Sequence, residues 1–210
     1  MIIINFKNYV SGAQVLDLVK KIEIYYSKAI VAVPVVDLAS AVKSTLLSIW
    51  AQHVDYQEDG KSTGSVVAEH LIAVGAAGSL LNHSERPISM IEIKRTIKRA
   101  NEVGLKLVVC ASTLAAVRQL LPLKPYAIAL EDKKLISTGK SITEYDTALL
   151  AKFVALLKES ECMPLCGAGI TTGSDVAKAL TLGCKGVLVS SAVANTQNPE
   201  KFLKEVAALV

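Results

Sequence analysis

Short, nearly uninterrupted apolar runs recur along the chain, and each is followed by a segment with the spacing of an amphipathic helix. The runs predicted as strands are Ile2–Phe6, Ala29–Pro34, Leu47–Gln52, Gly78–Asn82, Lys106–Cys110, Tyr126–Leu130, Met163–Cys166 and Gly186–Val189. Runs that are apolar at successive positions, rather than at alternate ones, are typical of parallel strands covered by helices. The pattern therefore predicts an α/β fold.

The helical segments carry end signals of their own. A hydroxyl residue followed three positions later by an acid or an amide fits a capping box at Ser11–Gln14 and at Ser89–Glu92. Gly104 stands where a C-terminal cap belongs, and Asn198–Pro199 reads as an N-cap followed by proline at the first helical position. These signals separate the predicted helices from the strands.

The number of strand–helix units predicts a (β/α)8 barrel, the TIM-barrel architecture. A doubly wound sheet is the alternative, but no G-x-G-x-x-G sequence follows the first strand. The chain has 210 residues, which makes the barrel compact beside the roughly 250 residues typical of this fold. No linker or change of composition divides the chain, so residues 1–210 are predicted to form a single catalytic domain.

The composition argues against several classes of protein. Hydrophobic residues make up 51% of the chain and aromatic residues only 5%, so the core is expected to be aliphatic. The net charge of +4 comes from scattered Lys and Arg residues, which favours small anionic ligands over nucleic acid. No apolar stretch approaches the roughly 20 residues of a membrane span, and the first residues lack a signal-peptide layout. We expect a cytoplasmic protein with no nucleic-acid or membrane partner.

The cysteines show no spacing that completes a metal site. They are Cys110, Cys162, Cys166 and Cys184. None belongs to a C-x-x-C pair, and no set of two histidines and one carboxylate is apparent. We expect buried, reduced thiols and no bound metal.

Chemically active side chains gather where the predicted strands end. In a (β/α)8 barrel the carboxyl ends of the strands meet at one mouth, and catalytic residues lie there. The residues at these ends are Asn5 and Lys7, His83 and Glu85, Glu131, Gly167 to Gly169, and Ser190 and Ser191. Each has an ordinary alternative: a surface lysine, a structural histidine, a solvated loop acid or a tight turn. Their convergence on one mouth favours an active site.

A lysine, an imidazole and a carboxylate around one pocket suit proton transfer next to a carbonyl group. A carboxylate can take a proton from the carbon, while a histidine N–H polarises the carbonyl and stabilises the enediolate that forms. Backbone N–H groups in the small-residue turns after the last two strands are the usual phosphate site of this fold. The residues thus predict a reaction on a small phosphorylated ligand without a cofactor.

Several motifs, in order along the whole chain, resemble those of one enzyme family. They are "INFK" at the first strand, "LLNHSERP" at the fourth, "LCGAGITTGSDV" at the seventh and "GVLVSSAV" at the eighth. This combination is similar to the triosephosphate isomerases, and specifically to their shorter archaeal form. The resemblance implies interconversion of dihydroxyacetone phosphate and D-glyceraldehyde 3-phosphate, in glycolysis and gluconeogenesis, without a cofactor.

The resemblance assigns roles to five side chains. Glu131 matches the general base that carries the proton between two carbons, and His83 matches the neutral electrophile known in this family. Lys7 matches the residue that stabilises the anionic intermediate, and Asn5 matches the amide beside the substrate oxygens. Glu85 matches an acid behind the histidine that supports it.

In the family, main-chain groups hold the phosphate and a lid closes over it. The matching phosphate contacts are Ile136, Ser137, Gly169, Ser190 and Ser191, and the matching lid is Asp132–Gly139. Asp132–Lys134 replaces the proline that follows the base in the family, and Ser137 replaces a glycine at the lid tip. Because proline fixes φ, its loss is expected to make the open lid more mobile. This departure concerns lid kinetics rather than the type of reaction.

The resemblance also implies assembly. The loop around Thr63, in "STGSV", looks like the loop that reaches into a partner subunit, so we expect a homodimer or a homotetramer. Two other functions stay open from the residues alone. One is another phosphate-binding barrel enzyme, such as a phosphosugar epimerase, aldolase or synthase. The other is a paralogue with an impaired lid that only binds a phosphorylated ligand.

Overall fold

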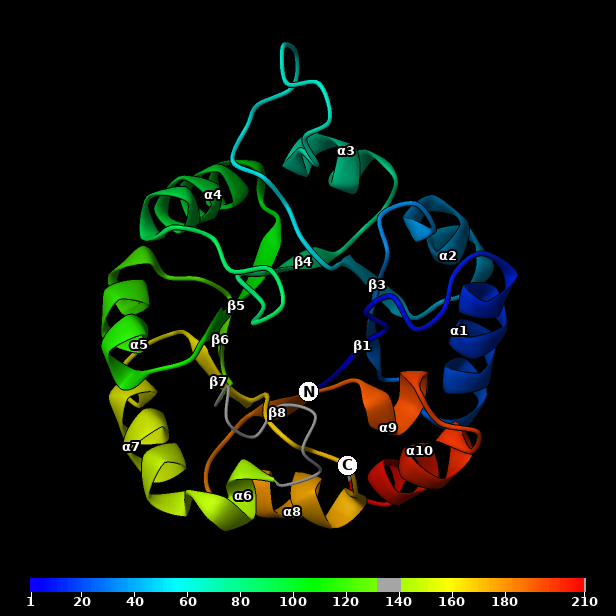
Figure 1. Ribbon diagram of the computed structural model, residues 1–210, viewed down its shortest axis with the longest axis vertical. Coiled ribbons are helices and arrows are strands. Elements are labelled where there is room, and N and C mark those ends of the chain that lie inside the picture. The colour runs from blue at the N-terminus through cyan, green and yellow to red at the C-terminus, as the bar shows by residue number, and fades with distance from the viewer. Residues whose placement is uncertain (132–140, 210) are drawn as a thin grey trace.

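The strands form a closed barrel in a computed structural model that describes residues 1–131 and 141–209. In this part of the chain eight parallel strands pair in chain order, and β8 returns to pair with β1 (Figure 1). The strands are β1 (Ile2–Asn5), β2 (Ile30–Val33), β3 (Ser48–Ala51), β4 (Gly78–Leu81), β5 (Lys106–Ala111), β6 (Ala127–Leu130), β7 (Met163–Cys166) and β8 (Gly186–Val189).

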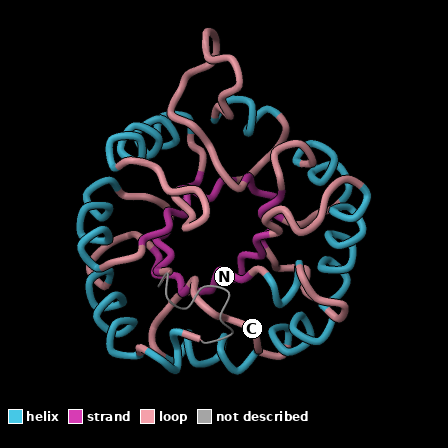
Figure 2. The backbone as a smooth tube through the Cα atoms, viewed as in Figure 1, coloured by secondary structure: helices cyan, strands magenta, loops and turns pink. Residues whose placement is uncertain are grey.

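The helices form a ring outside the strands, as Figure 2 shows. They are α1 (Ala13–Tyr25), α2 (Leu38–Ser44), α3 (Ala68–Ala73), α4 (Met90–Val103), α5 (Leu114–Leu120), the 3₁₀ turn η1 (Leu121–Leu123), α6 (Ile142–Tyr145), α7 (Thr147–Leu157), α8 (Gly173–Thr181), α9 (Ser191–Ala194) and α10 (Pro199–Ala207). This arrangement covers the outer face of every described strand, which explains why the apolar runs are nearly continuous.

The predicted TIM barrel is confirmed, and the observed strand boundaries lie within one residue of the predicted ones. The closing pair decides against a doubly wound sheet, because such a sheet has two edges. Ile3 pairs with Leu188 on one side and with Ile30 on the other, so β1 has no free edge. Closure brings the carboxyl ends of the described strands to one mouth.

Most of the predicted helix signals are confirmed. Ser89 and Glu92 form a reciprocal capping box at α4, and Gly104 ends that helix with a left-handed φ of +79°. The box predicted at Ser11–Gln14 is wrong: α1 begins after Gly12, with no side-chain cap. The reason is tertiary, because the Gly12 N–H donates to Asp37 Oδ1 at 3.0 Å, so Asp37 takes over one donor at this helix end.

Two apolar layers stabilise the barrel. One lies between the strands and the helices, and the other fills the interior of the barrel. The inner cluster holds Ile3, Ala32, Trp50, Leu80, Val108, Cys110, Ala127, Ala129, Leu165 and Leu188. Trp50, the single tryptophan of the chain, is 1% exposed and is the largest side chain in this cluster. The cysteines are buried and free, as expected.

Among the described residues, no helix is long and apolar enough to cross a membrane. The cytoplasmic location expected from the sequence stays a prediction.

Gly78 provides a test of how tightly the inner layer is packed. A Cβ at this position would lie 2.7 Å from the Trp50 ring and 2.7 Å from the Lys106 carbonyl oxygen. We expect Gly78→Ala to lower the free energy of unfolding by roughly 1–3 kcal/mol, because the added methyl overpacks the site. Urea denaturation followed by Trp50 fluorescence measures this change.

The control for this prediction is Gly104→Ala. There the added methyl meets open space but the left-handed φ is strained, so stability should fall without a change in the native Trp50 emission. In Gly78→Ala the native emission should shift. An unchanged native spectrum together with parental stability would contradict the close packing.

Candidate active site

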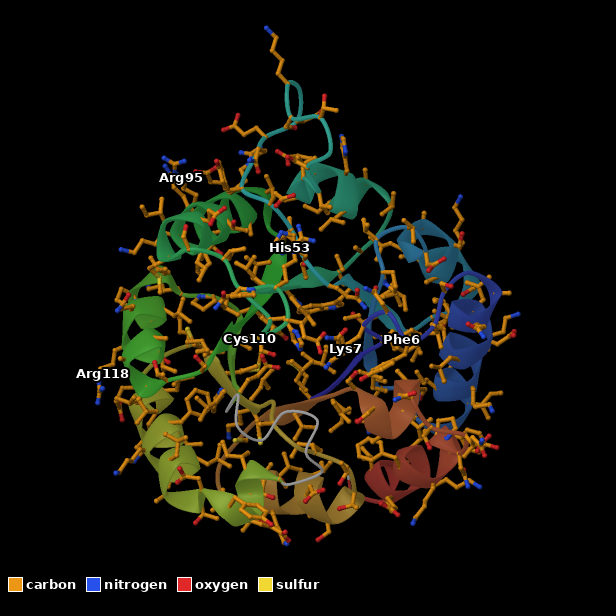
Figure 3. The ribbon with its side chains drawn as sticks, in the orientation of Figure 1. Phe6, Lys7, His53, Arg95, Cys110 and Arg118 are labelled. Carbon is orange, nitrogen blue, oxygen red and sulfur yellow. The ribbon has the colours of Figure 1, made fainter. Side chains whose placement is uncertain are left out.

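The residues predicted for the site come together at the mouth of the barrel. Figure 3 shows Lys7 and Cys110 toward the middle of the ring, whereas Arg118 points outward from α5. A cavity of about 230 Å³ lies there. Its lining includes Asn5, Lys7, His83, Glu131, Gly169, Ser190 and Ser191. Glu85 lies beside it and lines an adjoining cleft of about 650 Å³. Ile136 and Ser137 lie outside the described residues.

Lys7 is held in an unusual backbone conformation, with φ at +47°. Its N–H donates to Asn5 Oδ1 at 2.9 Å, and its carbonyl oxygen accepts from Gln52 Nε2 at 2.9 Å. The ammonium lies 2.6 Å from Glu85 Oε1, and the lysine side chain is only 12% exposed. A non-glycine residue with positive φ needs such surrounding contacts, since the conformation is strained. Neighbouring side chains therefore fix where this positive charge lies.

His83 is oriented by the main chain that follows it. Its Nδ1 accepts a hydrogen bond from the Glu85 N–H at 3.3 Å, so the proton of the neutral ring is assigned to Nε2. Nε2 lies 3.4 Å from Glu131 Oε1. The preceding Asn82 also has a positive φ, +56°, and its side chain bridges the Cys110 carbonyl and the Ile88 N–H. The ring thus presents an N–H donor to the cavity.

Glu131 is a buried carboxylate, only 3% exposed. Burial raises the pKa of Glu131, although His83, the Ser84 N–H, the Cys110 thiol and Lys7 each partly oppose the shift. The Ser84 N–H donates to Oε2 at 3.3 Å. Burial, the Glu131 charge and the hydrogen bond to it all raise the pKa of Cys110, so this thiol stays protonated and can donate. The raised pKa makes Glu131 a stronger base than an ordinary carboxylate.

Gly167 provides the space that Glu131 occupies. A Cβ on Gly167 would lie 2.9 Å from the Cγ of Glu131. The Gly167 N–H donates to the Leu130 carbonyl oxygen at 3.0 Å, which continues the β6–β7 pairing up to the mouth. A residue without a side chain is therefore required directly beside the carboxylate.

The turns after β7 and β8 can supply N–H groups for an anion. Asp175 Oδ2 accepts from the Thr171 and Thr172 N–H groups at 3.0 and 2.9 Å, which fixes the turn into α8. Gly169, in the same turn, has a φ of +70°. After β8, Ser190 precedes the first turn of α9. Main-chain N–H groups at such turns are suited to phosphate.

Comparison with known proteins agrees with this geometry. The sequence profile of triosephosphate isomerase matches residues 1–208. The chain belongs to the triosephosphate isomerase family. The triosephosphate isomerase of Sulfurisphaera tokodaii is 38% identical over 98% of this chain and 93% of the relative, and that of Archaeoglobus fulgidus is 34% identical over 100% and 98%. A crystal structure of triosephosphate isomerase from Bartonella henselae matches the fold with a TM-score of 0.75 at 21% identity, covering 99% of this chain and 98% of that chain.

Three residues around the candidate site were not predicted from the sequence. Gln52 and Cys110 end the third and fifth predicted strands, so the strand-end rule that found Glu131 could have found them as well. Gly167 was noted only as part of a phosphate turn. Its role beside Glu131 has no sequence signal, because it depends on a contact between neighbouring strands.

The burial of Glu131 predicts that this carboxylate lowers the stability of the folded chain. Because its pKa in the folded state is raised, the unfolded chain releases the proton first, and stability falls as the pH rises above about 4.5. Glu131→Gln removes this ionisation. We expect the variant to exceed the parent in free energy of unfolding by roughly 1 kcal/mol at pH 8.

Urea denaturation at pH 5 and pH 8, followed by Trp50 fluorescence, measures the difference in free energy of unfolding between variant and parent. This difference should be larger at pH 8 than at pH 5. Glu159→Gln, on an exposed residue just after α7, is the matched control and should show no such difference. A Glu131→Gln variant less stable than the parent at pH 8 would contradict the prediction.

Proposed function

We propose that the protein is a triose-phosphate isomerase. It interconverts dihydroxyacetone phosphate and D-glyceraldehyde 3-phosphate through an enediolate, in glycolysis and gluconeogenesis, with residues 1–210 acting as one catalytic domain. One observation carries the proposal most directly: a buried carboxylate, Glu131, lies 3.4 Å from Nε2 of His83, whose other ring nitrogen accepts a hydrogen bond from the main chain. Membership of the triosephosphate isomerase family supports the same reaction.

The proton transfer follows from these two side chains. Glu131 takes a proton from the carbon next to the substrate carbonyl and returns it to the neighbouring carbon. Its raised pKa favours this transfer, because the acceptor is a stronger base than an exposed carboxylate. The Nε2–H of His83 donates to the carbonyl oxygen as negative charge develops on it. Hydrogen only moves within one molecule, so the reaction needs no redox cofactor.

Charged and main-chain groups hold the anions of the reaction. The Lys7 ammonium, fixed by Glu85, stabilises the enediolate, while the Asn5 amide lies beside the substrate oxygens. The N–H groups of Gly169, Ser190 and Ser191 receive the phosphate. We assign the same role to Ile136 and Ser137 and a closing role to Asp132–Gly139; all these residues lie outside the described part of the chain.

Variants of the two proton-transfer residues test the reaction. We expect Glu131→Gln to lower kcat by about 10³-fold and His83→Gln by about 10²-fold, because each removes a group that acts in the transition state. The assay couples conversion of glyceraldehyde 3-phosphate to reduction of the dihydroxyacetone phosphate formed. Glu159→Gln, on an exposed residue outside both cavities, is the control and should turn over like the parent. Parental turnover in Glu131→Gln would end the proposal.

The same assay separates the alternatives. An epimerase, aldolase or synthase would not form dihydroxyacetone phosphate from glyceraldehyde 3-phosphate alone, although it could share the phosphate turns and Lys7. A paralogue that only binds its ligand would hold a phosphoglycolate-type analogue tightly but show negligible turnover. The association of Glu131, His83 and Lys7 in one cavity favours the isomerase over both.

We also propose that copies of this chain associate, as a homodimer or homotetramer, through the loop around Thr63. The cleft of about 650 Å³ beside Lys7 and Glu85 is the proposed receiving site. Its rim carries the exposed apolar side chains of Val35 and Val36, which are 49% and 83% exposed. Neighbouring exposed apolar side chains often mark a site of association with another protein. A two-fold pairing would place each Thr63 loop in the other copy's cleft.

A substitution on the rim tests this association. We expect Val36→Asp to raise the dissociation constant of the assembly by about tenfold or more, since it places an unpaired charge in an apolar contact. Sedimentation across a dilution series measures the constant. Leu46→Asp is the control, because Leu46 is also fully exposed, at 98%, but lies in the loop between α2 and β3 at the opposite end of the barrel. Equal weakening by both would contradict the assignment.

A further inference from the structure

One loop stands out from the round outline of the barrel, at the top of Figure 1, where the chain runs from β3 to α3. We call this segment, residues 55–66, the arm. Its tip contains Lys61 and Thr63, both outside the buried core, between two glycines with positive φ. Inside the arm the Ser62 N–H donates to Gly60 and the Ser65 N–H to Ser62. Surface loops this long usually serve a function of their own.

A single carboxylate closes the base of the arm. Asp55 Oδ2 accepts from the Val66 N–H at 2.8 Å, and the Asp55 N–H donates to the Val66 carbonyl oxygen at 2.8 Å. Asp55 Oδ1 lies 2.9 Å from His53 Nε2, on a histidine that is only 8% exposed. Asp55 thus joins the two ends of the arm to each other and to a buried ring.

The other tethers of the arm lie near its surface. The Arg95 guanidinium stacks over the Tyr56 ring, 5.2 Å from its centroid, on the outer side of the base (Figure 3). His70 and Asp59 pair at 3.2 Å, but their side chains are 67% and 69% exposed. Exposed pairs contribute little because water screens them. Closure of the arm therefore depends chiefly on Asp55.

His53 also faces the proposed receiving cleft. Its side chain lines the cleft of about 650 Å³ together with Gln52, Val66 and Lys7. The ring that holds the base of a copy's own arm is therefore part of the surface that would receive the other copy's arm. In a two-fold pairing, His53 would therefore hold the arm of its own copy and also line the cleft that receives the arm of the other copy.

We propose that the His53–Asp55 pair is a clasp that holds the arm in the shape needed to enter the cleft of a second copy. This inference rests on the association proposed above. An arm that is ordered before association loses less conformational entropy when it binds than one that must be ordered during binding. The clasp is thus a positioning device for assembly rather than part of the chemistry.

Asp55→Ala removes the clasp and leaves the tip of the arm unchanged. The Val66 N–H then loses its acceptor. The equilibrium between the closed and the open arm should shift toward the open arm by about 5- to 150-fold. We expect the dissociation constant of the assembly to rise by about tenfold or more. Asp55→Asn keeps an oxygen that can accept from the Val66 N–H, so its dissociation constant should lie between those of Asp55→Ala and the parent.

His70→Ala is the matched control. It also removes a histidine–aspartate pair that tethers the arm, but this pair is exposed and His70 lies on α3, outside the arm. Its dissociation constant should stay within about twofold of the parental value. Trp50 fluorescence and thermal unfolding verify that each variant is folded, and His53→Gln provides a second way to open the clasp if Asp55→Ala does not fold.

Limited trypsin digestion reports on the arm itself. Lys61 is the one basic residue in the sequence of the arm, and cleavage after it gives fragments 1–61 and 62–210, which mass spectrometry identifies. The rate is measured at a dilution where sedimentation shows single copies, so that a partner does not shield the arm. We expect cleavage about tenfold faster in Asp55→Ala than in the parent or in His70→Ala.

The two measurements distinguish the possible failures. Faster cleavage together with weaker association, specific to Asp55 and His53 variants, supports the clasp. If the parent associates, and Asp55→Ala associates and is cleaved just as the parent is, the clasp is overturned and the proposed association stands. If the parent is a single copy at every concentration, the association fails, and with it the role of the clasp in assembly.

Discussion

Closure of the barrel by the β1–β8 ladder is the constraint from which the site follows. Ile2, Ile3 and Ile4 pair with Val187, Leu188 and Val189, and this pairing leaves no open edge among the described strands. In an open sheet the first and eighth strands would lie far apart. In the barrel Lys7, after β1, and Ser190, after β8, line the same cavity as Glu131, after β6. Hydrogen bonds at the closing ladder therefore set the distances between groups that are remote in sequence.

Inside this barrel, the carboxylate of Glu131 is almost completely removed from water. Burial disfavours its charged form, and the groups around it compensate only in part. Two of these groups also serve the proposed chemistry: His83 donates to the substrate and Lys7 carries the positive charge. The structure thus tolerates an unfavourable charge at the place where a strong base is needed, which is a common trade between stability and activity.

The loops at the mouth are fixed by side chains rather than by regular secondary structure. Asn5 and Gln52 hold the strained backbone of Lys7, and Asn82 bridges two main-chain groups around His83. Asp55 does the same at the base of the arm. Amide side chains can accept from nearby N–H groups and donate to nearby carbonyl oxygens, and carboxylates can accept, so they hold loops in conformations that the backbone alone would not keep. These short polar residues allow a compact barrel to carry an ordered site.

Much of the architecture was predictable from the sequence because strands and helices are encoded locally. Apolar runs marked every strand of the barrel, and Ser89, Gly104 and Asn198 marked helix ends by their own chemistry. The cap at Ser11 failed because Gly12 donates to Asp37, a residue in another unit of the barrel. The strand-end rule also found Lys7, His83 and Glu131, since the fold alone decides that such ends meet.

The sequence by itself determined the order of elements, the family and the chemical groups of the site. Only the tertiary structure decided how those groups are tuned: the tautomer of His83, the burial of Glu131, and the space beside it at Gly167. It also decided that Asp55 closes the arm. The physical reason is that periodicity and capping act between neighbours in the chain, whereas burial, close approach and hydrogen bonding depend on residues that only the closed barrel brings together.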